Sequence, residues 1–153
     1  MICLLASRVM LVSALLGFQQ GDFAIQSTAF GKTYVSAVSE AKLLESPAWD
    51  EGESNPPVSA RSAMNLARIA LEAAIELPED CEWQQGSLQL MRPPMSDRRN
   101  ERWVWFVRFD GVKKTGVLPG SHKIQIMVLM NGKVVKPTVK PPAGEPEKTS
   151  NSK

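Results

Sequence analysis

The sequence predicts an α+β domain in which one main helix packs on an antiparallel sheet of three to four strands. Residues 102–137 are rich in β-branched and aromatic side chains, which favour strands. Within this stretch, Asn131-Gly132 separates two apolar runs, and Asn-Gly in that position is a strong hairpin signal. Residues 59–77 carry apolar side chains at the spacing of a helix that covers one face of a sheet.

Length and composition are those of one globular domain. The chain has 153 residues, of which 43% are hydrophobic and 22% are charged, so it can bury a substantial core. The net charge of +2 is unevenly distributed, since residues 40–82 are mostly acidic and residues 98–114 mostly basic. These two halves can neutralise each other within one fold, so the charge alone does not predict a partner.

Residues 1–18 have the pattern of a secretory signal peptide. One charge, Arg8, precedes the apolar run 9–18, and a short basic region followed by about 7–15 apolar residues is typical of export signals. The run is too short for a membrane-spanning helix, which needs about 20 apolar residues. We expect a secreted or periplasmic protein with no stable membrane span, cleaved within residues 17–29; a buried N-terminal helix is the alternative. Cleavage would leave Cys81 as the only cysteine, without an intramolecular disulfide.

Two short strands are expected before the main domain, near residues 23–28 and 33–44. They flank Phe30-Gly31-Lys32, where glycine permits a turn. Apolar residues in the second segment also fit a period of about 3.6 residues, so a helix is the competing interpretation of residues 35–44.

A linker completes the N-terminal segment, which spans residues 19–57. Residues 46–57 are rich in Ser, Pro, Asp and Glu, without an apolar period. The large apolar residue of this linker is Trp49. We expect its ring to fold back on the core and not to bind a ligand.

Ser59–Leu77 is expected to form the main helix. Ser59 suits the N-cap, because its hydroxyl can accept from free backbone N–H groups, and Pro78 cannot continue a helix. Polar side chains occupy one narrow stripe, and abundant alanines would let the helix lie close to a sheet.

Strands follow the helix in a meander that completes a domain spanning residues 58–137. A polar loop at 92–101 leads into the central strand. The tail, 138–153, is rich in Pro, Gly, Lys and Ser and lacks the apolar residues to offset ordering entropy, so we expect it to be disordered. The expected strands are 83–92, 102–109, 122–130 and 133–136.

Side chains of the central strand should alternate between the two faces of the sheet. Exposing two tryptophans would be costly, because each large aromatic buries about 150–250 Å². We therefore expect Trp103 and Trp105 to face the helix, where they would pack on Ala67, Leu71 and Ala74. Phe106 would then lie on the opposite face, covered in part by the N-terminal segment or by a partner.

Residues 59–137 resemble a PepSY-type domain. The similar features are the Ala-rich helix that opens Ser-Ala-Arg-Ser-Ala-Met, the strand Trp103-Val104-Trp105-Phe106-Val107 and the last hairpin around Asn131-Gly132. The segments 92–101 and 110–121 depart from the compact family pattern. The resemblance implies a non-catalytic extracytoplasmic module, of a kind that in some members is thought to restrain a peptidase. The whole chain also looks like small exported bacterial proteins of unknown function.

Residues suited to catalysis or metal binding are sparse. His122 is the only histidine and follows Ser121 where a loop enters a strand, so we expect a surface turn residue and not part of a catalytic relay. No Cys/His cluster has metal-ligand spacing, and the glycines of residues 111–120 do not form a phosphate loop. We expect no catalytic, metal or cofactor site, and a binding or inhibitory module and not an enzyme. The alternative is a small hydrolase that uses carboxylates of the 50–53 and 79–82 loops, about 5–10 Å apart.

Four arginines near the tryptophans of the central strand are the expected partner-binding residues. Basic residues interleaved with aromatic ones can bind single-stranded nucleic acid by stacking, but the export signal argues against that partner. Another extracytoplasmic protein such as a peptidase, or an anionic envelope polymer, fits better. The competing interpretation is a core strand with charged ends. The arginines are Arg98, Arg99, Arg102 and Arg108.

Overall fold

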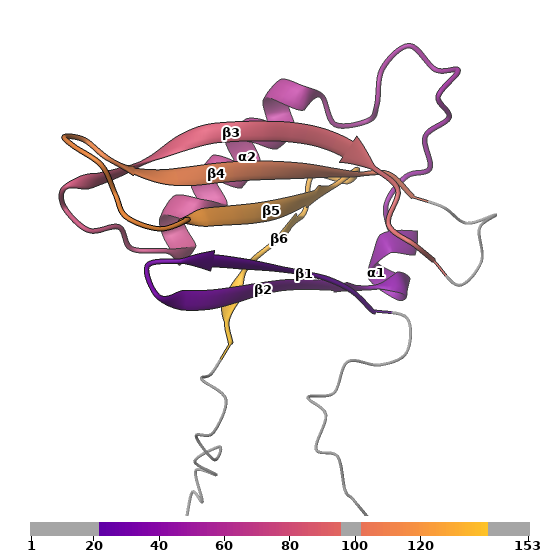
Figure 1. Cartoon of the computed structure of the whole chain (residues 1–153). Helices are drawn as coiled ribbons and strands as arrows, with labels where there is room; N and C mark the ends of the chain where they lie inside the picture. The colour runs from indigo at the N-terminus through magenta and orange to yellow at the C-terminus, as the bar shows by residue number, and fades with distance from the viewer. Residues whose placement is uncertain (1–21, 96–101, 141–153) are drawn as a thin grey trace, which may run out of the picture.

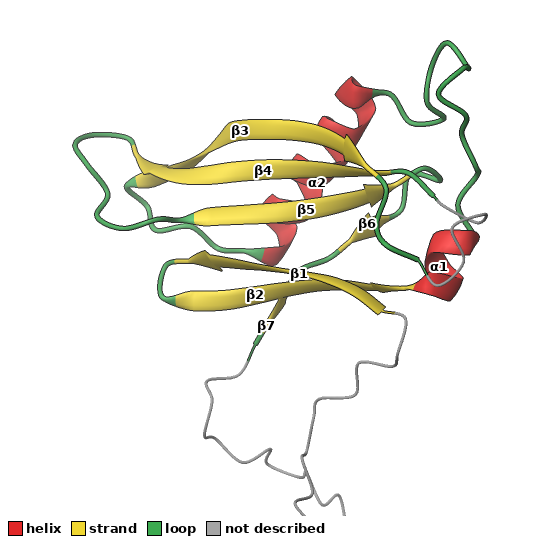
Figure 2. Ribbon diagram, turned by 45° about the vertical axis from the view of Figure 1, so that its right-hand side comes forward, coloured by secondary structure: helices red, strands yellow, loops and turns green. Residues whose placement is uncertain are grey.

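The computed structural model describes residues 22–95 and 102–140. Its framework is a seven-stranded antiparallel sheet in the order β3-β4-β5-β1-β2-β7, with β6 paired to β5 (Figure 1). The longer helix, α2, lies across one face of this sheet (Figures 1 and 2). The elements are β1 (Asp22–Ala29), β2 (Lys32–Ser39), α1 (Glu40–Leu44), α2 (Ala60–Ala74), β3 (Cys81–Met91), β4 (Val104–Lys113), β5 (Lys123–Leu129), β6 (Val134–Val135) and β7 (Thr138–Val139).

The expected architecture, one main helix on a sheet of three to four strands, is wrong. The structure is mostly antiparallel sheet with seven strands and a small helical share in two helices. The hairpin β1–β2 joins the sheet at β5, and β7 extends it beyond β2. These pairings join residues about a hundred positions apart, such as Thr28 and Lys123, and a local apolar pattern does not specify them.

The N-terminal segment forms both elements that its pattern allowed. Strands β1 and β2 form a hairpin, and the short helix α1 takes over where the second strand had been expected to continue. The turn between the strands has positive φ at both central residues, Phe30 (51°) and Gly31 (74°). Such turns match the right-handed twist of the strands, although Asn or Gly is the usual residue at the first position.

Helix α2 begins as expected and ends earlier. The Ser59 hydroxyl accepts a hydrogen bond from the Ser62 N–H at 3.2 Å, which confirms the N-cap. The helix ends at Ala74, before the expected end at Leu77, because Ile75 is extended and 4% exposed. Pro78 also disfavours helical backbone at the residue that precedes it.

One face of the central strands forms a hydrophobic core with α2. Trp105 is 8% exposed, and its indole N–H donates to the Val58 carbonyl at 2.8 Å, so the prediction that Trp105 faces the helix is confirmed. Trp103 is only partly buried at the margin of this core, and Ala74 is exposed and is not a member of it. We call this cluster the helix-side core; its main members are Ala63, Ala67, Leu71, Trp83, Trp105, Val107, Phe109, Ile124, Ile126 and Val128.

The opposite face carries a second, smaller core. Phe106 lies here, as expected, and the Phe23 ring meets it edge-on with centroids 5.9 Å apart. The N-terminal segment therefore covers this face, together with α1. We call this cluster the α1-side core; its buried members are Val38, Leu43, Val104, Phe106, Met127 and Leu129.

The turn after β5 and the C-terminal strand complete the sheet. The turn expected at Asn131-Gly132 is present, with Gly132 at φ 80° and its N–H donating to the Leu129 carbonyl at 2.9 Å. The first residues of the tail that was expected to be disordered, 138–153, are ordered, because Thr138–Val139 form β7 and pair with β2. The rest of that stretch, 141–153, lies outside the described residues. Within the described ranges, no helix is long and apolar enough to cross a membrane.

Candidate functional site

The four arginines expected to bind a partner do not form one described cluster. Arg98 and Arg99 lie outside the described residues. Arg102 precedes β4, and its Nε donates to the Ser46 carbonyl at 3.0 Å. Arg108 lies near the middle of β4. Trp105 points into the helix-side core, so its ring cannot stack on a ligand at the surface.

The margin of the sheet near Arg102 is occupied by contacts within the chain. The rings of Trp49 and Trp103 meet edge-on with centroids 5.3 Å apart, which confirms that Trp49 folds back. The Arg92 guanidinium lies 4.8 Å from the centre of the Trp103 ring and 3.5 Å from a carboxylate oxygen of Glu51. The open pocket here, about 520 Å³, is therefore bordered by groups that already contact one another, and this cluster fastens the linker to β4.

The carboxylates of the alternative hydrolase hypothesis are not brought together. The loop 50–53 precedes α2 in the sequence and the loop 79–82 follows it. The helix has 15 residues and is therefore about 22 Å long. Figure 1 shows the two loops at opposite ends of the helix. Asp80 is paired with Lys113 at 3.2 Å, and a hydrogen bond from Lys113, followed by one from Cys81, lowers the pKa of its carboxyl.

Cys81 is a buried thiol at the start of β3, 5% exposed and not in a disulfide. Burial raises the pKa of the Cys81 thiol, and the hydrogen bond to Asp80 raises it further. Because the thiolate is the nucleophilic form, this environment disfavours nucleophilic chemistry. Nor do three or more His, Cys, Asp or Glu side chains gather into a metal-binding group anywhere in residues 22–95 and 102–140.

A pocket of about 490 Å³ lies where β1 diverges from β5, and we call it the polar pocket. Its lining has no apolar and no acidic side chain, but it has two cations, three hydroxyl groups and two amides. The lining residues are Gln26, Ser27, Thr28, Arg108, Ser121, Lys123 and Gln125.

The polar pocket exists because the β1–β2 hairpin pairs with β5 over a short distance only. Thr28 and Lys123 are the single residue pair of the β1–β5 ladder. Further along β5, the Gln125 N–H donates to the Ser27 hydroxyl at 3.0 Å, so a side chain replaces the next backbone partner. The strands then separate, and the polar side chains of both line the opening.

The charge of the polar pocket is positive. Arg108 is paired with Asp110 at 3.5 Å, and Lys123 is the cross-strand neighbour of Asp110 in the β4–β5 ladder. The Lys123 ammonium makes no ion pair with any described residue, and its side chain is exposed. The carboxylate of Asp110 therefore lies beside two cations, Arg108 and Lys123, and Asp110 itself does not line the polar pocket.

The Arg108–Asp110 pair lies over a glycine. The ladder between β3 and β4 shifts register at Gly86, where a β-carbon would come within 2.6 Å of Arg108 Nε and 2.9 Å of Nη2. Arg108 Nε and Asp110 Oδ1 are buried without a hydrogen-bond partner in the described chain. The bulge thus makes room for the ion pair, whose atoms are not all satisfied within the protein.

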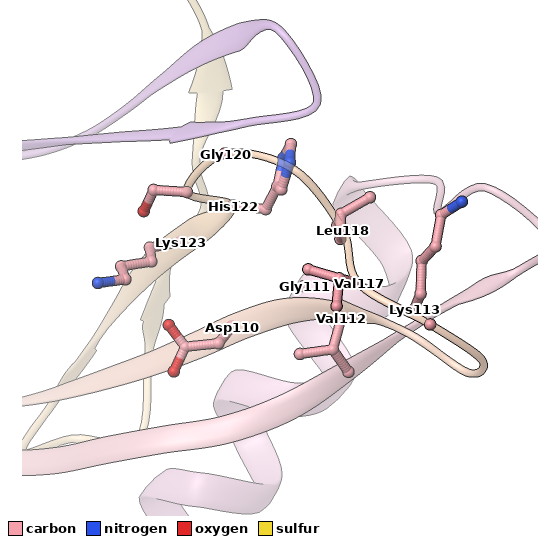
Figure 3. Close-up of a pocket in the computed structure, with 11 residues that line it drawn as sticks. Asp110, Gly111, Val112, Lys113, Val117, Leu118, Gly120, His122 and Lys123 are labelled. Carbon is pink, nitrogen blue, oxygen red and sulfur yellow. The ribbon is translucent and has the colours of Figure 1, made fainter.

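A second hollow of about 460 Å³, the loop pocket, adjoins the polar pocket at Ser121 and Lys123. Figure 3 shows the His122 ring pointing from this loop toward the β1–β2 hairpin. His122 Nδ1 accepts a hydrogen bond from the Phe30 N–H at 2.9 Å, and the two rings stack with centroids 4.7 Å apart. His122 is therefore a structural contact between distant segments, which no local sequence signal had indicated.

Comparisons with known proteins identified no relative of this chain. No family model, no curated protein and no solved structure matches the chain. The resemblance to PepSY-type domains therefore stays a prediction.

Proposed function

We propose that the protein is an exported, non-catalytic binding module whose polar pocket holds an acidic sugar unit of an anionic envelope polymer. The observation that carries this proposal is the lining of the pocket, which offers two cations and five neutral hydrogen-bonding side chains without a carboxylate. Ionised donors such as Lys123 and Arg108 bind carboxylates through charge-assisted hydrogen bonds, which are stronger than neutral ones.

The neutral side chains of the pocket favour a sugar over a simple anion. Ser27, Thr28 and Ser121 can donate and accept hydrogen bonds, and so can the amides of Gln26 and Gln125. A sugar ring presents hydroxyl groups of the same two kinds. A uronic acid unit would therefore match both the charge and the hydrogen-bonding groups of the lining.

Export of the protein is supported by the signal-like pattern of residues 1–18. We expect the protein outside the cytoplasm of its host, with a mature chain that begins between about residues 18 and 30. Cell fractionation followed by intact-mass measurement checks this. A soluble cytoplasmic species that retains Met1 would contradict export.

Titration calorimetry with oligogalacturonate, against neutral galactose oligomers of equal length, tests the binding proposal. We expect the acidic oligomer alone to bind, and Lys123→Gln to weaken it about tenfold, because one charge-assisted hydrogen bond is worth roughly 1.5 kcal/mol. Lys140→Gln is the matched control, since it removes the same charge from an exposed position outside the polar pocket.

The remaining outcomes separate the competing proposals. Equal weakening by Lys123→Gln and Lys140→Gln would mean that net charge binds the polymer and that the polar pocket does not. Binding of an acidic peptide in preference to the oligogalacturonate would favour a protein partner, such as a peptidase. Release of reducing ends from the oligomer would revive the hydrolase hypothesis.

A further inference from the structure

We propose that His122 is a pH-sensitive latch, which in its neutral form holds the tip of the β1–β2 hairpin against β5 and opens when the ring is protonated. Gln26, Ser27 and Thr28 of β1, next to this tip, form one wall of the polar pocket. The consequence for ligand binding rests on the proposed function, whereas the latch itself does not.

The two hydrogen bonds of the His122 ring define one neutral tautomer. The Phe30 N–H can only donate, so Nδ1 at 2.9 Å must accept and carries no proton. The Pro119 carbonyl can only accept, so Nε2 at 2.8 Å must carry the proton. A protonated ring has donors at both nitrogens, and Nδ1 could then no longer accept from Phe30.

The conformation of Phe30 depends on the same contact. Phe30 has φ 51°, in the left-handed region that residues with a β-carbon disfavour. Its ring is stacked on His122 at an interplanar angle of 19° and meets Trp83 edge-on at a centroid distance of 5.7 Å. Gly111 provides the space, since a β-carbon there would lie 2.9 Å from the Phe30 ring.

Few other hydrogen bonds of the described chain attach this part of the hairpin to β5. The backbone ladder between β1 and β5 consists of one residue pair, Thr28 and Lys123, supported by the hydrogen bond between Ser27 and Gln125. The contact between Phe30 and His122 lies beyond this pair, at the tip. Loss of the Nδ1 hydrogen bond therefore removes one of the few described hydrogen bonds that join the tip to β5, while Ala29 remains buried in the helix-side core.

The surroundings of the ring contain charges of both signs. Strand β4 contributes Asp110 and Lys113 to the loop pocket, and β5 contributes Lys123. The hairpin and β3 present the uncharged rings of Phe30 and Trp83. Lys113 is paired with Asp80 and Asp110 with Arg108, which leaves Lys123 to oppose a positive ring. The lost acceptor at Nδ1 acts in the same direction, so acid weakens the attachment.

Amide hydrogen exchange of the mature protein, followed by NMR at about pH 7.5 and about pH 5, tests the latch across the range in which histidine changes charge. After correction for the intrinsic pH dependence of exchange, we expect the protection factors of the Phe30 and Gln125 amides to be roughly three- to tenfold lower in acid. This decrease corresponds to the loss of one hydrogen bond. The Ile126 amide, in the middle of β5, is the internal reference and should not change.

Two variants make the test specific. His122→Asn places an amide oxygen near the position of Nδ1 without a titrating group, so the protection of Phe30 should no longer depend on pH. His122→Phe keeps a ring for stacking but has no acceptor, so Phe30 should be weakly protected at both pH values. Equal acid sensitivity in His122→Asn and the wild type would overturn the latch, as would unchanged protection in the wild type.

A binding measurement separates the latch from the proposed function. Oligogalacturonate should bind the wild type more weakly at the lower pH, and His122→Asn equally at both. If the amides respond but the oligomer binds at neither pH, the proposed function fails and the latch stands. If the oligomer binds and neither amides nor affinity respond to pH, the latch fails and the proposed function stands.

Discussion

The two faces of β4 and β5 are built from alternate residues of the same strands, but the polarity of their side chains differs toward one end of the sheet. On the helix side, apolar residues continue along the strands from Trp105 to Phe109 and from Ile124 to Val128. On the opposite side, Phe106 and Met127 belong to the α1-side core, but Arg108 and Gln125 follow and line the polar pocket. One face is a continuous core, whereas the other is half core and half polar surface.

This difference shows how the sheet accommodates both stability and a candidate site. Helix α2 packs across β4 and β5 on one face, so the inward positions of these strands can be apolar there. Among the described residues, those that cover the opposite face come from α1, from the open end of the β1–β2 hairpin, and from Met95 and Val135. Beyond this cover, Lys123 and Gln125 are polar at little cost in stability, because they remain in contact with solvent. Arg108 Nε and Asp110 Oδ1 are the buried exceptions there.

Removing a large side chain from the helix-side core should have the largest effect. We expect Trp105→Ala to lower the free energy of unfolding by roughly 3–5 kcal/mol, since it empties a large aromatic from a core and leaves the Val58 carbonyl without its donor. Urea denaturation measures this. Trp103→Ala, at the partly buried margin, should cost clearly less. Stability near that of the wild type for both variants would refute the core assignment.

The α1-side core should be the weaker of the two. Leu43, the 1% exposed residue of α1, covers a single end of the sheet. We expect Leu43→Ala to cost roughly 2–3 kcal/mol, the low end of the range for such changes, because a short helix can relax into the space. A cost above that of Trp105→Ala in the same urea series would reverse the ranking of the faces.

Adding a side chain beneath the polar half of the opposite face should lower the free energy of unfolding less than emptying either core. A β-carbon at Gly86 would displace the ends of the Arg108 and Asp110 side chains, which are flexible and can move. We expect Gly86→Ala to cost about 1 kcal/mol, within the usual range for an added group that breaks a partly exposed ion pair. Gly52→Ala, in an open loop, is the control. A loss comparable to that of Leu43→Ala would mean that this region is as tightly packed as the α1-side core.

Local signals predicted the elements of the helix-side core. Ser59, the alanines of α2 and the alternation from Trp105 to Phe109 each depend on neighbours in sequence, and they placed α2 and the central strands correctly. The number of strands was wrong, because β1 and β7 join the sheet through pairings between distant residues. A short strand with mixed polar and apolar residues carries little information about its partner.

The candidate site was harder to predict than the fold, for the same reason. The expected arginines were chosen by proximity in sequence, but β4 places Arg108 in the polar pocket, whereas Arg102, which precedes β4, lies beside the linker. Ser27 and Lys123 are brought together by the β1–β5 pairing. The isolated Lys123 and the lone His122 carry no motif, so only the three-dimensional arrangement distinguishes them from ordinary loop residues.

The smallest effect is expected at the rim of the helix-side core, where Asp80 pairs with Lys113 at 3.2 Å in solvent. The hydrogen bonds from Lys113 and Cys81 lower the pKa of the folded Asp80 carboxyl below that of the unfolded chain. The pair therefore contributes stability above the unfolded pKa, and this contribution is lost as the pH falls through the folded pKa. Asp80→Asn should lower the urea midpoint slightly at neutral pH and not at all in strong acid. A difference that persists in acid would show that the substituted amide disturbs packing at Cys81 and that the charge of Asp80 is unimportant.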